Sequence, residues 1–148
     1  MTDTADAETA GAKTTGVKTT SAETTGAVTG GLRTLLRLEG LALFTGMTLL
    51  YVVWDGSWWV YAVLFFAPDL SFAGYLAGPK VGAIVYNIAH SYMGPMALMT
   101  TGFTISEPLV LSVAMIWMAH IGFDRALGYG LKYASGFGFT HLGRIGKP

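Results

Sequence analysis

Four long apolar runs dominate the chain and alternate with short polar connections. They cover residues 35–54, 58–77, 81–103 and 108–127. Each run has roughly the 20 residues that an α-helix needs to cross a hydrocarbon core of about 30 Å. The pattern therefore predicts an all-α fold, a polytopic membrane protein whose domain of four transmembrane helices spans residues 32–127.

The connections between the runs carry turn and helix-start signals. Asp55, Gly56 and Ser57 form a tight turn between the first two runs, since Asp and Gly supply the side-chain hydrogen bond and positive φ that turns need. Pro108 after Glu107 suits the start of the fourth helix, because proline fits a first turn and a carboxylate favours the N-terminus. These signals separate the runs into individual helices.

The two ends of the chain differ from the apolar part. Residues 1–31 are mostly Thr, Ala and Gly, and such a composition cannot bury enough apolar surface to order the chain. We expect a disordered cytoplasmic tail there. Residues 128–148 are Gly-rich with spaced aromatic side chains, and we expect this segment to pack on the bundle or lie at the membrane surface.

The basic residues indicate the orientation of the chain in the membrane. They precede the first run, separate the second from the third, or follow the end of the fourth: Lys13, Lys18, Arg33, Arg37, Lys80, Arg125, Lys132, Arg144 and Lys147. The other two connections carry only Asp55 and Glu107 as charged residues. Because basic loops resist translocation, both termini are predicted to lie in the cytoplasm of a multi-pass plasma-membrane protein.

Composition narrows the classes of function. The chain is 52% hydrophobic and 12% charged, with a mean hydropathy of +0.50, whereas soluble domains carry roughly twice that charged fraction. Its net charge is zero and it shows no basic face, which argues against nucleic acid as a partner and leaves the lipid bilayer. The absence of cysteine excludes disulfides, thiolate catalysis and Cys-based zinc sites.

Ionisable and amide side chains inside the apolar runs are the candidate functional residues. Such groups are costly in hydrocarbon and usually face a partner or a water-filled cavity. All of them fall in the predicted cytoplasmic half, with at least one on each helix: Glu39, Asp69, Asn87, His90, His120, Asp124 and Arg125. Asp69 and His90 lie at nearly the same depth, ~14 Å from the cytoplasmic helix ends at 1.5 Å per residue. A polar pocket in that half of the bundle is the strongest functional hint in the sequence.

Spacing and residue type suggest what this pocket could hold. His120 and Asp124 are four residues apart and share a helix face, and a carboxylate there can orient an imidazole or add a metal ligand. With His90 and Asp69 they have the ligand types for a divalent metal. No local metal-binding motif accompanies them. Asp69 also follows Pro68, which removes a backbone donor in mid-span, as happens beside transporter cavities.

A purely structural interpretation stands beside the functional one. Asp124 and Arg125 would form an interfacial ion pair at the end of the fourth helix. Glu39 would pair with a basic side chain at the headgroups, and His90 would hydrogen bond across helices. Asp69 would cap the helix segment that restarts after Pro68.

Several stretches of the chain resemble a bacterial membrane-protein family known as domain of unknown function 4260. They are residues 36–40 (LRLEG), 56–59 (GSWW), 67–71 (APDLS), 74–79 (GYLAGP), 85–90 (VYNIAH), 119–125 (AHIGFDR), 128–133 (GYGLKY) and 140–145 (THLGRI). The resemblance extends over about residues 33–147. It implies a small multispan protein and assigns no reaction.

Three functions remain open from the sequence. The pocket could bind or move a small solute or proton, and transport by so few helices would require a homodimer. It could instead be an intramembrane hydrolase that uses a metal held by His90, His120, Asp69 and Asp124 on a lipid-like substrate. In the third case the polar residues only lock the bundle, and the protein is a structural or assembly partner.

Overall fold

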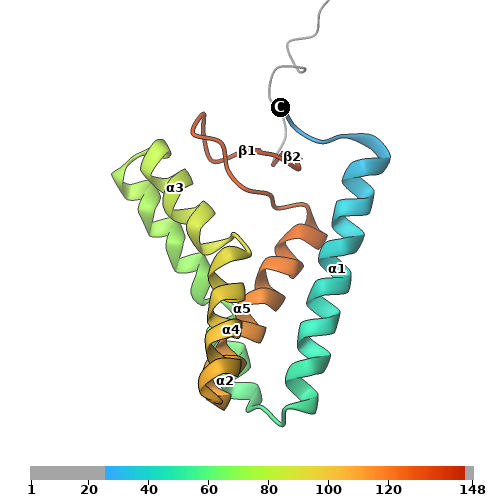
Figure 1. Cartoon of the computed structure of the whole chain (residues 1–148). Coiled ribbons are helices and arrows are strands. Elements are labelled where there is room, and N and C mark those ends of the chain that lie inside the picture. The colour runs from blue at the N-terminus through green and yellow to red at the C-terminus, as the bar shows by residue number, and fades with distance from the viewer. Residues whose placement is uncertain (1–25, 146–148) are drawn as a thin grey trace, which may run out of the picture.

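The computed structural model describes residues 26–145 and is mostly helical (Figure 1). The expected disorder of residues 1–31 falls largely on residues 1–25, which lie outside the described part. The helices and strands, in chain order, are α1 (Gly30–Val53), α2 (Trp58–Phe65), the 3-10 helix η2 (Ala67–Ala77), α3 (Pro79–Ala89), α4 (Met93–Ile105), α5 (Pro108–Leu127), β1 (Phe139–Thr140) and β2 (Gly143–Arg144).

Within residues 26–145, three helical segments are long and apolar enough to cross a membrane, as expected of a membrane protein. They are α1, the consecutive helices α2 and η2, and α5. The chain passes along the molecule four times, with α3 and α4 together making the third pass (Figure 1). The start of α1 and the end of α5 therefore lie at the same end of the molecule, which also carries the C-terminal segment (Figure 1).

The third pass differs from the continuous helix predicted for residues 81–103. α3 ends at Ala89, α4 begins at Met93, and His90 between them leaves the helical conformation with φ −110° and ψ 14°. Pro95 explains the break, because proline cannot donate a backbone hydrogen bond and its ring clashes with the carbonyl four residues earlier. It is tolerated in the first turn of α4, where no intrahelical donor is needed.

The second pass breaks where the sequence places Pro68. α2 ends at Phe65 and the chain continues as η2, with Pro68 in its first turn. A 3-10 helix is narrower and longer per residue than an α-helix, so the side chains after the break leave the α-helical periodicity. Both breaks lie in the middle of a pass, and each adjoins or contains a polar residue. Asp69 comes directly after Pro68, and His90 lies in the break between α3 and α4.

α5 forms the centre of the molecule and is buried over most of its length. α1 packs against it through glycines: a Cβ built on Gly40 would lie 2.8 Å from the Gly122 carbonyl oxygen and 2.5 Å from Arg125 Cβ. Small residues allow this close backbone approach, as is typical of helix pairs in membranes. The opposite face of α1 exposes Leu35, Leu38 and further apolar side chains, as expected of a surface in contact with lipid.

The C-terminal segment, residues 128–145, folds back across one end of the helices (Figure 1). β1 and β2 form a short antiparallel hairpin. The side chain of Asn87 on α3 binds the backbone of Lys132 at both ends of its amide, accepting from the Lys132 N–H at 2.7 Å and donating to its carbonyl at 2.9 Å. These two hydrogen bonds hold the backbone of Lys132 against α3.

Candidate metal centre

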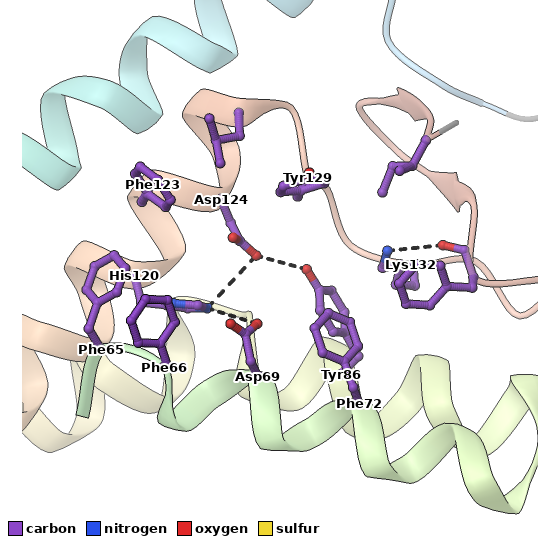
Figure 2. Close-up of a pocket in the computed structure, with 13 residues that line it drawn as sticks. Phe65, Phe66, Asp69, Phe72, Tyr86, His120, Phe123, Asp124, Tyr129 and Lys132 are labelled. Atoms are coloured by element: carbon purple, nitrogen blue, oxygen red, sulfur yellow. Dashed lines mark hydrogen bonds and ion pairs between the residues drawn. The ribbon is translucent and has the colours of Figure 1, made fainter. Parts of the chain in front are cut away.

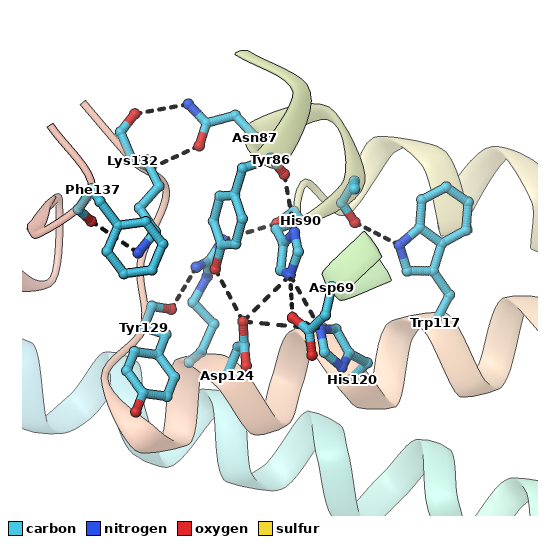
Figure 3. A network of polar contacts seen from close by, with 12 residues as sticks. Asp69, Tyr86, Asn87, His90, Trp117, His120, Asp124, Tyr129, Lys132 and Phe137 are labelled. Carbon is cyan, nitrogen blue, oxygen red and sulfur yellow. Dashed lines mark hydrogen bonds and ion pairs between the residues drawn. The ribbon is translucent and has the colours of Figure 1, made fainter. Parts of the chain in front are cut away.

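Four ionisable side chains converge inside the molecule from three separate parts of the chain. Asp69 comes from η2, His90 from the break between α3 and α4, and His120 and Asp124 from α5 (Figure 3). One ligand atom from each side chain lies within 4.8 Å of all the others. We call this set the Asp–His cluster.

Local structure explains why these side chains meet. His120 and Asp124 are one helical turn apart on the buried face of α5. Asp69 follows the break at Pro68, and His90 is itself the residue at which the third pass breaks. The two helix interruptions therefore aim side chains from the second and third passes at the same point on α5.

The distances within the cluster match those between ligands of one metal ion. His90 Nε2 lies 3.1 Å from His120 Nε2 and 3.5 Å from one oxygen of each aspartate. His120 Nε2 lies 3.6 Å from Asp69 Oδ1 and 4.0 Å from Asp124 Oδ2. Ligand atoms that sit 2.0–2.2 Å from a common ion lie roughly 3–4 Å apart in tetrahedral or octahedral geometry. The cluster could therefore accept an ion with little movement.

Hydrogen bonding fixes the tautomer of His90. Its Nδ1 lies 3.0 Å from the carbonyl oxygen of Tyr86, which can only accept, so Nδ1 carries the proton. In its neutral form this imidazole presents the Nε2 lone pair to the two carboxylates and to His120 Nε2. An imidazole that donates its other N–H to a backbone carbonyl is the usual arrangement of a metal-ligating histidine.

Neighbouring side chains hold the cluster in place. The Tyr86 ring stacks on His90 with centroids 3.7 Å apart, and its hydroxyl donates to Asp124 Oδ2 at 3.1 Å. Phe65 contacts His120 edge to face. Arg125 donates to the carbonyls of His90 and Tyr129 at 3.0 and 2.7 Å. The first of these bonds satisfies the backbone oxygen that the helix break leaves free.

The hydrogen bonds of residues 26–145 leave part of the cluster unsatisfied. His90, His120 and Asp124 are 0%, 2% and 8% exposed, so water compensates them poorly. His120 Nδ1 is buried with no hydrogen-bond partner among residues 26–145. The buried Asp124 and the partly exposed Asp69 both face the Nε2 atom of His90, and a cation between these groups would stabilise the arrangement. A divalent ion would balance both carboxylates.

A pocket of about 370 Å³ adjoins the cluster (Figure 2). Asp69, His120 and Asp124 line it, and Asp69 is the most accessible of the four, with 34% of its side chain exposed. Most of the remaining wall is aromatic, and Lys132 supplies its basic group. Burial lowers the pKa of the Lys132 amine, and the Asp124 carboxylate opposes this shift.

Three of the seven residues predicted for the polar pocket lie outside the Asp–His cluster. Asn87 binds the backbone of Lys132. Arg125 is buried beside the cluster and donates to carbonyls. Glu39 is exposed on α1 and lines a different pocket, together with Arg125 and His141. Within the described residues, Glu39 makes no ion pair, and Arg125 does not pair with Asp124.

Sequence reasoning missed two residues that shape this site. Tyr86 precedes His90 by four residues and so shares its helix face, a signal that the sequence did contain. Lys132 appeared as one of the basic residues that indicate orientation and within the stretch 128–133 that carries the family resemblance, and it was given no role in the site. No local pattern shows that residue 132 turns back against α3, because that contact depends on Asn87, 45 positions away.

The site falls within the part of the chain that matches a known family. Neither a curated protein nor a solved structure matches the chain. The model of the family described as a domain of unknown function (DUF4260) matches residues 33–145, which include the whole Asp–His cluster, Tyr86 and Lys132. The chain therefore belongs to the DUF4260 family.

Proposed function

We propose that the protein is a metal-dependent membrane hydrolase whose Asp–His cluster holds one divalent transition-metal ion. The observation that carries this proposal is the convergence of four ligand atoms within 4.8 Å, two of them imidazole nitrogens. Mixed imidazole and carboxylate ligands suit Zn²⁺, Mn²⁺ and Fe²⁺. The tautomer of His90 and the charge of the two aspartates support the same choice.

Exposure divides the four side chains into two roles. His90, His120 and Asp124 are buried and serve as the protein ligands, whereas Asp69 faces the pocket with a third of its side chain accessible. Three protein ligands with an open position for water are typical of catalytic metal sites. An ion held by these residues would make bound water a nucleophile near neutral pH.

Asp69 is placed to take the proton from that water. In the hydrolytic step the water oxygen bonds to the electrophilic carbon or phosphorus, and the bond to the leaving oxygen breaks. Asp69 accepts one proton from the water and passes it to the leaving oxygen, so atoms and charge balance. The adjoining pocket provides the space for the substrate.

The proposal also includes an orientation for the four passes. The beginning of α1, the end of α5 and the C-terminal segment share one end of the molecule, and the basic residues lie at this end of the apolar runs. The positive-inside rule then puts this end in the cytoplasm of a cell whose plasma membrane the chain crosses. The metal centre would lie in the cytoplasmic half of the bundle.

Metal analysis of the detergent-purified protein tests the proposal directly. We expect close to one equivalent of a transition metal in the wild type and a large loss in a His90→Ala/His120→Ala variant of verified fold. The matched control is His141→Ala, which removes the third histidine of the chain and should retain the metal. A wild-type protein that binds no metal, natively or after addition of Zn²⁺, Mn²⁺ or Fe²⁺, would contradict the proposal and leave solute binding or a structural role.

A second variant separates metal binding from catalysis. Asp69→Asn keeps the shape of the side chain but cannot accept a proton. We expect it to retain most of the metal and to lose hydrolytic turnover by 10²-fold or more. If Asp69→Asn loses the metal as fully as the double histidine variant, Asp69 is a ligand and not the base.

A further inference from the structure

We infer that the pocket beside the Asp–His cluster binds a single-chain amphiphile with a monoanionic head group. Lys132 and the metal ion would hold the head group, and the aromatic wall would hold the chain. This inference rests on the proposed metal centre and adds to it the class of molecule that the site recognises. Three features carry it: the position of Lys132, the charge of the site, and the apolar rim of the pocket.

Lys132 is a buried cation with unused donor capacity. It is 4% exposed, and its ammonium donates to the Phe137 carbonyl at 3.0 Å. The same group lies 3.9 Å from the centre of the Phe137 ring and 5.1 Å from that of Tyr86. An ammonium has three N–H donors, and that bond is the single one it makes within the described residues. No carboxylate lies within 4.0 Å of it in this part of the chain, so the pocket carries a cation that a bound anion could pair.

The charges around the pocket favour one negative charge on the ligand. Among the residues that line the pocket, Asp69 and Asp124 together balance a divalent ion, and Lys132 then leaves one positive charge. Arg125 is buried beside the cluster but does not line the pocket, and its guanidinium donates to two backbone carbonyls. Burying the charge of Lys132 without a counter-ion is costly. A carboxylate, or a phosphodiester with one negative charge, would neutralise this charge and could also bind the ion.

The walls and the rim of the pocket are suited to a hydrocarbon chain. Five phenylalanines line it, together with Leu127 and Ile145: Phe65, Phe66, Phe72, Phe123 and Phe137 (Figure 2). Phe66, Leu127 and Phe137 are 63%, 50% and 50% exposed, so the pocket reaches the outer surface of the protein through apolar side chains. In a membrane protein such a rim faces lipid or the headgroup boundary, from which an amphiphile can enter sideways.

The size of the pocket limits the ligand to one chain. Its volume of about 370 Å³ lies at the small end of the range for ligand sites, roughly 300–1,000 Å³. A head group and part of a single chain fill that space, whereas two acyl chains are too large for it. A fatty carboxylate, which is also what hydrolysis of an acyl ester releases, has the required charge and shape.

Binding of decanoate to the protein in lipid nanodiscs tests this inference. Equilibrium dialysis would compare labelled decanoate with acetate, which has the head group without the chain, and decanol, which has the chain without the charge. Protein-free nanodiscs give the background. We expect decanoate to bind at least tenfold more tightly than either of the other two. Acetate binding as tight as that of decanoate would identify a site for free anions and overturn the inference.

Lysine variants show whether the head group is held where we place it. Lys132→Met removes the charge and should weaken decanoate binding tenfold or more, whereas Lys132→Arg should bind within about threefold of the wild type. Lys80→Met changes an exposed lysine on α3 and is the matched control. The backbone contacts of Lys132 with Asn87 do not involve its side chain, so the fold should survive both changes. Unchanged binding in Lys132→Met would overturn the inference.

Metal content measured on the same samples separates this inference from the proposed function. Metal-containing protein that shows no Lys132-dependent decanoate binding would leave the hydrolase proposal standing and overturn the inference. Protein that takes up no metal but whose decanoate binding still depends on Lys132 would overturn the hydrolase proposal and the role of the ion in holding the head group, and would leave Lys132 as the group that binds the carboxylate.

Discussion

At the scale of single residues, the tyrosine beside the cluster is as informative as the ligands themselves. Tyr86 contributes its carbonyl to His90 Nδ1, its ring to the face of the same imidazole, and its hydroxyl to Asp124. One residue therefore orients two of the four side chains. Partners of this kind hold ligands in the geometry that a metal requires.

Replacing Tyr86 with phenylalanine isolates the contribution of the hydroxyl. The backbone bond and the ring stack on His90 remain, while Asp124 loses its hydrogen bond. We expect metal affinity to fall by roughly 10- to 100-fold, as is usual when an outer partner of a ligand is removed. Competition with a chelator of known affinity measures this change. Tyr129→Phe alters a tyrosine that lines the same pocket and should have little effect; equal losses in both variants would contradict the role given to Tyr86.

The types of residue in the cluster could be predicted from the sequence, but their convergence could not. Depth along each helix placed Asp69 and His90 at one level, and a spacing of four placed His120 beside Asp124. A helical depth does not say which way a side chain points around its axis. That direction depends on packing between passes, which is why Glu39, polar and in the same half, lies on an exposed face of α1 instead.

At the scale of secondary-structure elements, prolines determine where two of the passes break. Pro68 was interpreted in the sequence as a mid-span interruption, and it lies in the first turn of η2. Pro95 was not, and the continuous helix predicted for residues 81–103 is two helices with His90 between them. A hydropathy profile averages over a window of about 20 residues, so it does not detect a break of three residues within an apolar run. The break matters because it provides both the position of His90 and a free carbonyl for Arg125.

Packing between α1 and α5 gives a prediction at the same scale. Gly40 and Gly46 lie on the same helix, but a Cβ on Gly40 would meet Arg125 Cβ at 2.5 Å, whereas one on Gly46 would meet nothing within 4 Å. Gly40→Ala should therefore destabilise the protein by about 1–3 kcal/mol, because backbone and Cβ atoms cannot move aside. Gly46→Ala should be neutral or slightly stabilising. Unfolding of both variants in a mild detergent titrated with SDS checks this pair, and equal stabilities would contradict the close contact.

At the scale of the whole molecule, the fold brings the basic residues and the polar site toward one end. Four passes return the chain to the end at which α1 begins (Figure 1). The even number of spans that the charge pattern requires stays a prediction: within residues 26–145, three helical segments are long and apolar enough to cross a membrane, and the third pass is two shorter helices. In the proposed orientation, a metal ion in the Asp–His cluster would reach its site from the cytoplasm, and the pocket would open through apolar side chains toward lipid.

The orientation can be tested with single cysteines, because the chain has none of its own. Ser57 lies in the turn between α1 and α2, Ser135 lies in the C-terminal segment, and both are exposed. If the basic end is cytoplasmic, a membrane-impermeant maleimide should label Ser57→Cys in intact cells and Ser135→Cys only after permeabilisation. The reverse pattern would put the Asp–His cluster in the outer half of the bundle. Labelling of both positions in intact cells would mean that the chain crosses the membrane an even number of times between them, or that molecules of both orientations are present. Labelling of Ser57→Cys alone would fix the side from which metal and water reach the site.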